Sequence, residues 1–198
     1  MHKPLITIVL ISILITGCKK ERDIAPILFN PSISYGSMTD QNGNTYKTVT
    51  IGTQVWMAEN LQTTKYRSGD PIPNVTNATY AVTDSRNLAP DGWHVATIYE
   101  WLAMITFVGD GAYWLQEKML EEAGGNHWIY SIGATNESGF TALPGGIRRR
   151  WTTISGLNIT KPSEYMFLGQ QYYFWTQTSP DSVEYTPNLG KSIRCVKD

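Results

Sequence analysis

The sequence predicts an α+β fold built on an antiparallel sheet. Three observations support this class: a strand hairpin near the start of the domain, two amphipathic helical segments in its middle, and short β-like runs towards its end. Consecutive strands without crossover helices must pair through hairpins or loops, which makes the sheet antiparallel. The composition agrees, because 17 Gly and 10 Pro among 198 residues, with 12% aromatic residues, fit a turn-rich exported domain better than a helix bundle.

The first 17 residues have the pattern of a bacterial signal peptide. A basic start at Lys3 precedes an apolar run of about thirteen residues, which is too short to span a bilayer as a stable helix. The run ends in "ITGC", which resembles a lipobox, the motif whose cysteine receives acyl chains such as palmitate. Two or three chains, at about 0.8 kcal/mol per buried methylene, hold a protein on a membrane more firmly than one. We therefore expect Cys18 to be lipidated and to anchor the protein to the cell envelope, at the outer membrane, without crossing it.

Residues 18 to 37 are expected to be a tether between the lipid and a domain formed by residues 38 to 198. The tether has a charged start, two prolines and no sustained period, but its apolar stretch "IAPILF" leaves open packing on the edge of the domain. Removal of the signal peptide leaves about 180 residues, enough for one domain. It also removes Lys3 and changes the formal charge from -1 to about -2, so no basic excess predicts a nucleic acid partner.

A β-hairpin is predicted at residues 46 to 58. Asn42-Gly43 is a turn pair, and β-forming residues alternate from residue 46 to residue 51. Gly52-Thr53 then forms a tight turn into a second strand at residues 54 to 58. The oxygen-bearing residues around Asn42 do not make an EF-hand calcium loop, which needs glycine at its sixth position and glutamate at its twelfth.

Two helices follow a turn-rich loop region at residues 62 to 91. Thr97 and Glu100 form a capping box for the first helix, and Gly109 is placed to end it. Its helically spaced apolar residues, expected in the core, are Ile98, Trp101, Leu102 and Ile105. The second helix is expected from residue 112 to residue 123, with Gly124-Gly125 as its stop.

Beyond residue 125 the chain is predicted to form short β-like runs separated by turns. These runs are "HWIYSI", "GFTALPGG", "EYMFLGQQYYFWTQT", "SVEYT" and "SIRCV". The last run contains Cys195, which we expect to be buried as a small hydrophobic residue, with Arg194 on the opposite face of the strand.

No pattern in the sequence predicts catalysis, a metal or a cofactor. His94 and His127 lie in no zinc-ligand spacing, and each is expected to be a structural histidine with hydrogen-bond partners. A nucleophile elbow and a phosphate-binding loop are both absent from the sequence. We therefore expect a protein that is not an enzyme.

Two aromatic and basic clusters have the chemistry of a ligand-binding surface. In "GGIRRRW" an extended chain places Arg148 and Arg150 on one face and Arg149 and Trp151 on the other, a combination that suits carboxylates and stacked rings, although a solvated loop remains an alternative. In "QYYFWT" one pair of rings enters the core while the alternate pair is offered to a ligand.

Several stretches together resemble the Fibrobacter succinogenes major paralogous domain, a module of exported and lipid-anchored proteins of Bacteroidetes-like bacteria. These stretches are "YKTVTIGTQVWMAENLQTTKYRSGDPIPNV", "PDGWHVATIYEW", "GATNESGFTALPGGIR" and "SIRCVKD". The family is similar to the C-type-lectin-like fold and to formylglycine-generating domains, and "HVATIYEW" and "SIRCV" are like segments of the latter. The resemblance implies two helices packed around irregular antiparallel sheets.

The departures from the family pattern bear on function. Ala89 stands where relatives often have a cysteine, so the disulfide that the resemblance implies between that position and Cys195 is missing here. Formylglycine-generating catalysis uses a pair of cysteines with copper, and apart from Cys18 the mature chain has one cysteine. The calcium motifs of C-type lectins, Glu-Pro-Asn and Trp-Asn-Asp, are also absent.

We therefore expect a lipid-anchored, non-catalytic domain that binds a glycan or a surface protein. The alternative is a structural subunit of an envelope or fimbria-like assembly. In this fold class, loops of the C-terminal half bind the ligands. The candidate ligand-binding residues there are Arg148, Arg149, Trp151, Tyr172, Tyr173 and Trp175.

Overall fold

The computed structural model describes most of the chain after residue 24. The described residues are 25–73, 79–109, 118–130, 133–149, 164–166, 168, 170–172, 174, 176 and 189–198. The predicted signal peptide, the predicted lipidation residue Cys18, the run "SVEYT" and the first half of the second predicted helix, residues 112 to 117, lie outside them.

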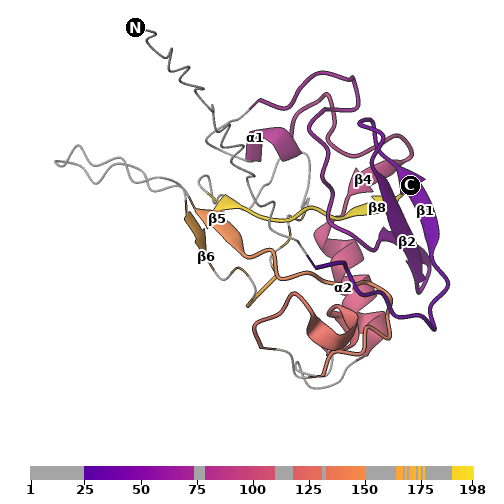
Figure 1. Cartoon of the computed structure of the whole chain (residues 1–198). Helices are drawn as coiled ribbons and strands as arrows, with labels where there is room; N and C mark the ends of the chain where they lie inside the picture. The colour runs from indigo at the N-terminus through magenta and orange to yellow at the C-terminus, as the bar shows by residue number, and fades with distance from the viewer. Residues whose placement is uncertain are drawn as a thin grey trace, which may run out of the picture.

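A five-stranded antiparallel sheet forms one end of the molecule (Figure 1). Its order is β1 (Gly36–Thr39), β2 (Thr45–Ile51), β3 (Gln54–Met57), β8 (Cys195–Lys197) and β4 (Trp93–Val95). The last strand of the chain thus lies between β3 and β4 and is antiparallel to both. Segments from the first part of the domain and from its C-terminus therefore pair in the middle of one sheet.

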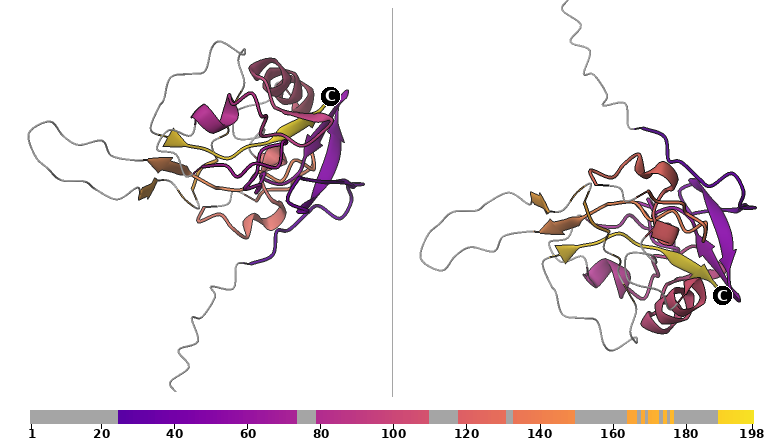
Figure 2. Two further views of the ribbon diagram at one scale, coloured as in Figure 1. Left: turned by 90° about the horizontal axis from the view of Figure 1, so that it is seen from above. Right: turned by 90° about the horizontal axis from the view of Figure 1, so that it is seen from below.

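A second, three-stranded antiparallel sheet lies at the opposite end of the molecule (Figures 1 and 2). Its order is β6 (Glu164–Met166), β5 (Ile147–Arg149) and β7 (Leu189–Gly190). The chain runs from β7 directly into β8 and so connects the two sheets. Antiparallel sheets with helical segments between them confirm the predicted α+β class.

The predicted hairpin is present with the expected turns. Before β2, the Asp40 carboxylate accepts the backbone N–H groups of Asn42 at 2.8 Å and Asn44 at 2.9 Å. Gly43 and Gly52 adopt φ angles of 85° and 61°, a region that favours glycine. In β2 the buried residues change faces: Tyr46 and Thr48 are buried, and so are Val49 and Ile51. The strand therefore has core on both sides, whereas simple alternation has core on one side.

Helix α2 (Ile98–Val108) has the predicted boundaries. The Thr97 side chain accepts the N–H of Glu100, the Glu100 carboxylate accepts the N–H of Thr97, and the N–H of Gly109 donates to the carbonyl of Ile105. The prediction that Leu102 lies in the core is wrong, because Leu102 is 53% exposed while Trp101 beside it is buried. Adjacent helical residues point about 100° apart, so both cannot lie on the same narrow stripe.

The second predicted helix ends earlier than expected. Residues 118 to 120 are helical, but Glu121 forms a bridge with Ala142, and a 3-10 turn, η1 (Ala123–Gly125), follows. The Glu122 N–H donates to the Ala142 carbonyl at 3.1 Å, so pairing with a distant segment replaces the last helical turn. The loop region contains one short helix that was not predicted, α1 (Thr79–Val82). The run "HWIY" forms turns and bends, not the predicted strand.

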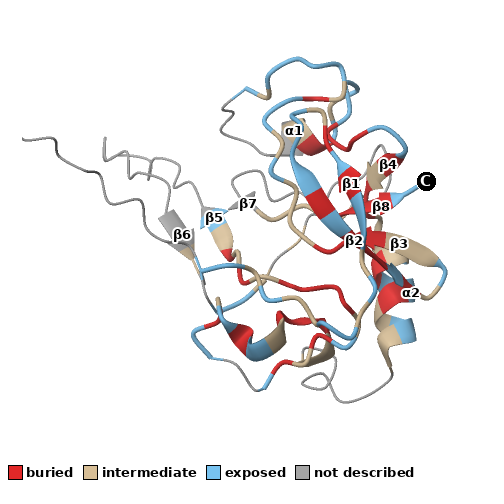
Figure 3. Cartoon of the chain, turned by 45° about the vertical axis from the view of Figure 1, so that its right-hand side comes forward, coloured by how far each residue is buried: buried red, intermediate tan, exposed pale blue. Residues whose placement is uncertain are grey.

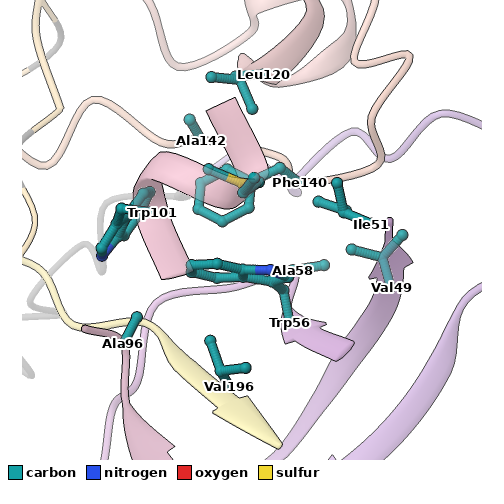
Figure 4. Close-up of a cluster of buried hydrophobic side chains, with 11 residues drawn as sticks. Val49, Ile51, Trp56, Ala58, Ala96, Trp101, Leu120, Phe140, Ala142 and Val196 are labelled. Carbon is teal, nitrogen blue, oxygen red and sulfur yellow. The ribbon is translucent and has the colours of Figure 1, made fainter. Parts of the chain in front are cut away.

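The core consists of two clusters, one on each face of the five-stranded sheet. Trp56, Trp101 and Phe140 centre the first cluster, with ring centroids 4.9 to 5.7 Å apart (Figure 4). Met57 and Cys195, each next in sequence to a member of the first cluster, belong to the second. Neighbouring strand residues point to opposite faces, so β3 and β8 are covered on both sides. Figure 3 shows these buried segments, in contrast to the largely exposed strand β1.

The segment before β1 packs on the domain. The rings of Phe29 and Tyr35 lie 5.3 Å apart and, with Ile33, contact the first core cluster. The side-chain amide of Asn30 donates to the carbonyls of Thr135 at 3.1 Å and Asn136 at 3.2 Å. Residues 25 to 37, which belong to the predicted tether, thus contact the domain in the way left open for the stretch "IAPILF".

Candidate ligand-binding surface

The structure describes three of the six predicted ligand-binding residues, Arg148, Arg149 and Tyr172. Arg148 and Arg149 lie in β5, where Arg148 is opposite Tyr165 of β6 and Gly190 of β7. The Arg148 side chain is exposed. The Gly146 N–H, just before β5, donates to the Gln171 carbonyl at 3.0 Å, so the arginine strand adjoins the segment that carries Tyr172. Trp151, Tyr173 and Trp175 lie outside the described residues.

Tyr172 is half-buried and belongs to a series of aromatic rings that runs out from the core. Trp101 stacks on Phe174 with centroids 4.9 Å apart and planes at 28°. Phe174 lies 5.7 Å from Tyr172, and Tyr172 meets Trp128 edge-on at 5.8 Å. Tyr172 therefore has one side fixed by packing while the residue stays partly open to solvent, as is useful for a ring that contacts a ligand.

Trp128 is a candidate that the sequence reasoning missed. Its residue is 9% exposed, and its indole Nε1 has no hydrogen-bond partner in the described part of the chain. A buried indole N–H usually finds an acceptor, so this donor shows that the described residues do not complete the surroundings of the Trp128 side chain. Ile129 and Tyr130, the next two residues, are 59% and 77% exposed. The run of large apolar residues in "HWIY", shortly after Gly124-Gly125, is the signal that could have identified it.

We call Trp128, Ile129, Tyr130 and Tyr172 the aromatic surface. Aromatic faces contact the C–H groups of sugars and the apolar side chains of proteins. Arg148, two residues after the hydrogen bond between Gly146 and Gln171, adds a positive charge on the adjoining strand. The arrangement is suited to binding, and it contains no nucleophile paired with a base among these residues.

The loop that carries Trp128 is held by a buried carboxylate. Glu122 is completely buried and accepts the backbone N–H of His127 at 3.0 Å and the ring Nδ1 of His127 at 2.8 Å. The other ring nitrogen, Nε2, lies 2.8 Å from the carbonyl oxygen of Ala25. The ring of His127 is thus fixed between Glu122 and the backbone of the segment before β1.

His94 also links two carboxylates. Its Nδ1 lies 2.6 Å from Asp198 Oδ1 and its Nε2 lies 2.7 Å from Glu100 Oε1. Burial disfavours the charged ring, but the hydrogen bonds to Asp198 and Glu100 outweigh it and raise the pKa of His94. The network ties β4 to the capping box of α2. No three His, Cys, Asp or Glu side chains of the described residues are grouped so that they could hold a metal ion.

Cys195 is the buried thiol that the sequence predicts. It is 0% exposed and forms no disulfide within the described residues. Burial raises its pKa to about 12. The thiol is thus protonated and inaccessible at neutral pH, which makes it unsuitable as a nucleophile.

Comparison with known families identifies the domain. The family model of the Fibrobacter succinogenes major domain matches residues 78–197, more than half of the chain and a span that runs from just before α1 to β8. The hairpin strands β1 to β3 precede the match but complete the sheet around β8. Comparisons with curated proteins and with solved structures found no match, so the C-type-lectin-like likeness stays a prediction. The chain belongs to the Fibrobacter succinogenes major domain family.

Proposed function

We propose that this protein is a bacterial lipoprotein of the outer membrane, anchored through Cys18, whose domain binds a glycan or a surface protein without catalysing a reaction. The observation that carries the binding role is the exposure of Ile129 and Tyr130 next to Trp128, whose ring packs edge-on against the half-buried ring of Tyr172. A glycan fits this surface, because a sugar offers C–H faces for stacking on aromatic rings. The α+β order of helices and antiparallel sheets supports a C-type-lectin-like domain.

A glycan array with the full-length protein in detergent tests the binding role. Tyr130→Ala removes the exposed ring of the aromatic surface, and Tyr172→Ala removes the half-buried ring. We expect each change to weaken binding by about tenfold, the equivalent of one stacking contact of about 1.4 kcal/mol. The matched control is Tyr99→Ala, which removes a 74% exposed aromatic residue on α2. An array without signal for the wild-type protein contradicts the glycan role.

The anchor has its own test. Among the described residues, no helix has the length and apolar character needed to cross a membrane. We expect Cys18→Ser to move the protein from the membrane fraction to the soluble fraction, because the substitution removes the acylated side chain. Membrane partition that is unchanged in this variant contradicts lipidation at Cys18.

A second candidate, a structural subunit of an envelope or fimbria-like assembly, is favoured by the outer face of α2. Tyr99, Leu102 and Phe107 are 74%, 53% and 66% exposed, and the other exposed residues of that helix, Ala103 and Thr106, are uncharged. Uncharged apolar faces of this kind often take part in protein contacts. If this role holds, the wild-type protein self-associates in sedimentation experiments and Leu102→Glu makes it monomeric, while the glycan array stays blank.

A further inference from the structure

A cavity of about 360 Å³ lies away from the aromatic surface, between the N-terminal segment, strand β2 and the end of helix α2. Its lining residues include Ile33, Val49, Ile51, Phe107, Met119 and Glu137. Cavities that hold small ligands begin at about 300 Å³, so this one is large enough for a small organic molecule. None of its lining residues belongs to the aromatic surface, so it is a separate candidate site.

The inner wall of the cavity is apolar and tightly built. Val49 and Ile51 are 4% and 3% exposed and belong to the first core cluster. Gly139 lets Ile33 and Val49 approach each other, since a Cβ at this position would lie 2.8 Å from a methyl carbon of each. Its φ of 74° also favours glycine. The wall is therefore a fixed feature of the packed domain, which favours binding of a ligand with an apolar body.

Phe107 stands at the solvent side of the cavity and is held there by the β2–β3 turn. The residue is 66% exposed although it lines the cavity. Its ring lies against Gly52, where a Cβ would be only 3.1 Å from Cδ2 of the ring. A ring that is supported on one side and exposed on the other offers an aromatic face to a ligand.

The charge of the cavity is negative. Glu137 is exposed, and no Lys, Arg or His of the described residues forms an ion pair with it. Among the described residues that line the cavity none is basic, and the other polar ones are Ser34, Thr50 and Ser138. An anionic ligand would be repelled by Glu137, while a cation gains from both the carboxylate and the electron-rich face of an aromatic ring.

From this combination we propose that the cavity binds a small organic cation, an alkylammonium whose apolar part contacts Val49 and Ile51 and whose charged group lies between Phe107 and Glu137. The site is independent of the proposed glycan or protein ligand, because the two surfaces share no residue. A blank glycan array therefore leaves this inference intact, and the reverse is also true.

Three probes of equal chain length test the proposal: butylammonium, butanol and butyrate, each titrated against the full-length protein in detergent and followed by saturation-transfer NMR. We expect butylammonium to bind at least tenfold more tightly than butanol, and butyrate to give no signal. Equal binding of butylammonium and butanol, or no binding of butylammonium, overturns the proposal.

Two variants locate the charged group. Glu137→Gln removes the charge and keeps the shape, and Phe107→Leu keeps an apolar side chain without an aromatic face. We expect up to about a fivefold loss of butylammonium affinity in the first variant and a severalfold loss in the second. Tyr99→Leu is the control, since Tyr99 is exposed on the same helix and does not line the cavity. Unchanged affinity in Glu137→Gln, with the fold intact by circular dichroism, also overturns the proposal.

Discussion

The guanidinium of Arg194 donates a hydrogen bond from Nη2 to the carbonyl oxygen of Thr141 at 2.8 Å, and both residues are completely buried. The same side chain donates to the carbonyls of Met57 and Phe140 and to the side-chain oxygen of Asn60, at 2.8 to 3.0 Å. Burial lowers the pKa of Arg194 to about 9, so it is still charged at neutral pH. One cation thus joins β8, the end of β3 and the loop around Thr141.

Arg194→Lys is expected to destabilise the domain strongly. The substitution keeps the charge, but one ammonium cannot reach the four acceptors that the planar guanidinium serves, so buried carbonyls lose their partners. We expect a loss of roughly 3 kcal/mol in the free energy of unfolding, measured by urea denaturation. Lys197→Met, an exposed change three residues further on, at the end of β8, should leave stability nearly unchanged. A stability of Arg194→Lys equal to the wild type contradicts this account.

The elements that the sequence predicts well are those with local signals. Helix α2 follows from Thr97, Glu100 and Gly109, which determine its ends through contacts within one or two turns. The hairpin follows from Gly43 and Gly52, whose positive φ angles lie in turns between paired strands. The burial of Cys195 follows from the apolar pattern of the last strand together with its lack of a partner.

The features that the sequence does not predict depend on contacts between distant residues. Arg194 meets Thr141 53 positions away in the sequence, and no local pattern marks an arginine as buried. The early helix end at Leu120 depends on Ala142, and the position of Trp128 depends on Tyr172. Alternation proposed Arg148 and Tyr172 as candidates without deciding which rings of "QYYFWT" face the core, whereas Trp128 and the cavity at Phe107 required the fold.

His94 should make stability depend on pH above its ordinary titration range. Its pKa is raised above the ordinary value of 6.5, so the folded state binds the proton more tightly than the unfolded chain does. The contribution of the network with Glu100 and Asp198 is therefore complete below about pH 6.5 and is lost as the pH rises through the folded-state pKa. We expect His94→Gln to lower the melting temperature at about pH 6 and to have little effect at about pH 9. An effect of the same size at both pH values contradicts a charged His94.

Glu122 should control how firmly the segment before β1 is held. Glu122 Oε1 accepts the N–H of Leu28 at 2.7 Å, and Oε2 accepts from His127. Glu122→Gln places an amide N–H₂ against one of these donors and removes the charge, so we expect a loss of roughly 3 kcal/mol in stability and faster hydrogen exchange at the Leu28 amide. Glu137→Gln changes an exposed, unpaired carboxylate among the described residues and is the control. Hydrogen exchange of the Leu28 amide at the wild-type rate in Glu122→Gln would falsify this role of Glu122.

Ala89→Cys is expected to form a disulfide with Cys195. Both residues are completely buried and belong to the second core cluster, and Ala89 occupies the position at which the family resemblance implies the partner cysteine. The bond would close a loop of about 105 residues and could raise the free energy of unfolding by up to about 4 kcal/mol in the chain-entropy model.

The measurement is the melting temperature of Ala89→Cys with and without reductant, with Ala89→Ser as the size-matched control. We expect a higher melting temperature only for the oxidised cysteine variant. In the wild-type protein, Cys195 should react with a thiol reagent slowly in the native state and rapidly in urea, because burial keeps it inaccessible and raises its pKa. Rapid native-state labelling, or a cysteine variant that stays reduced under oxidising conditions, would show that the two positions do not face each other in the core.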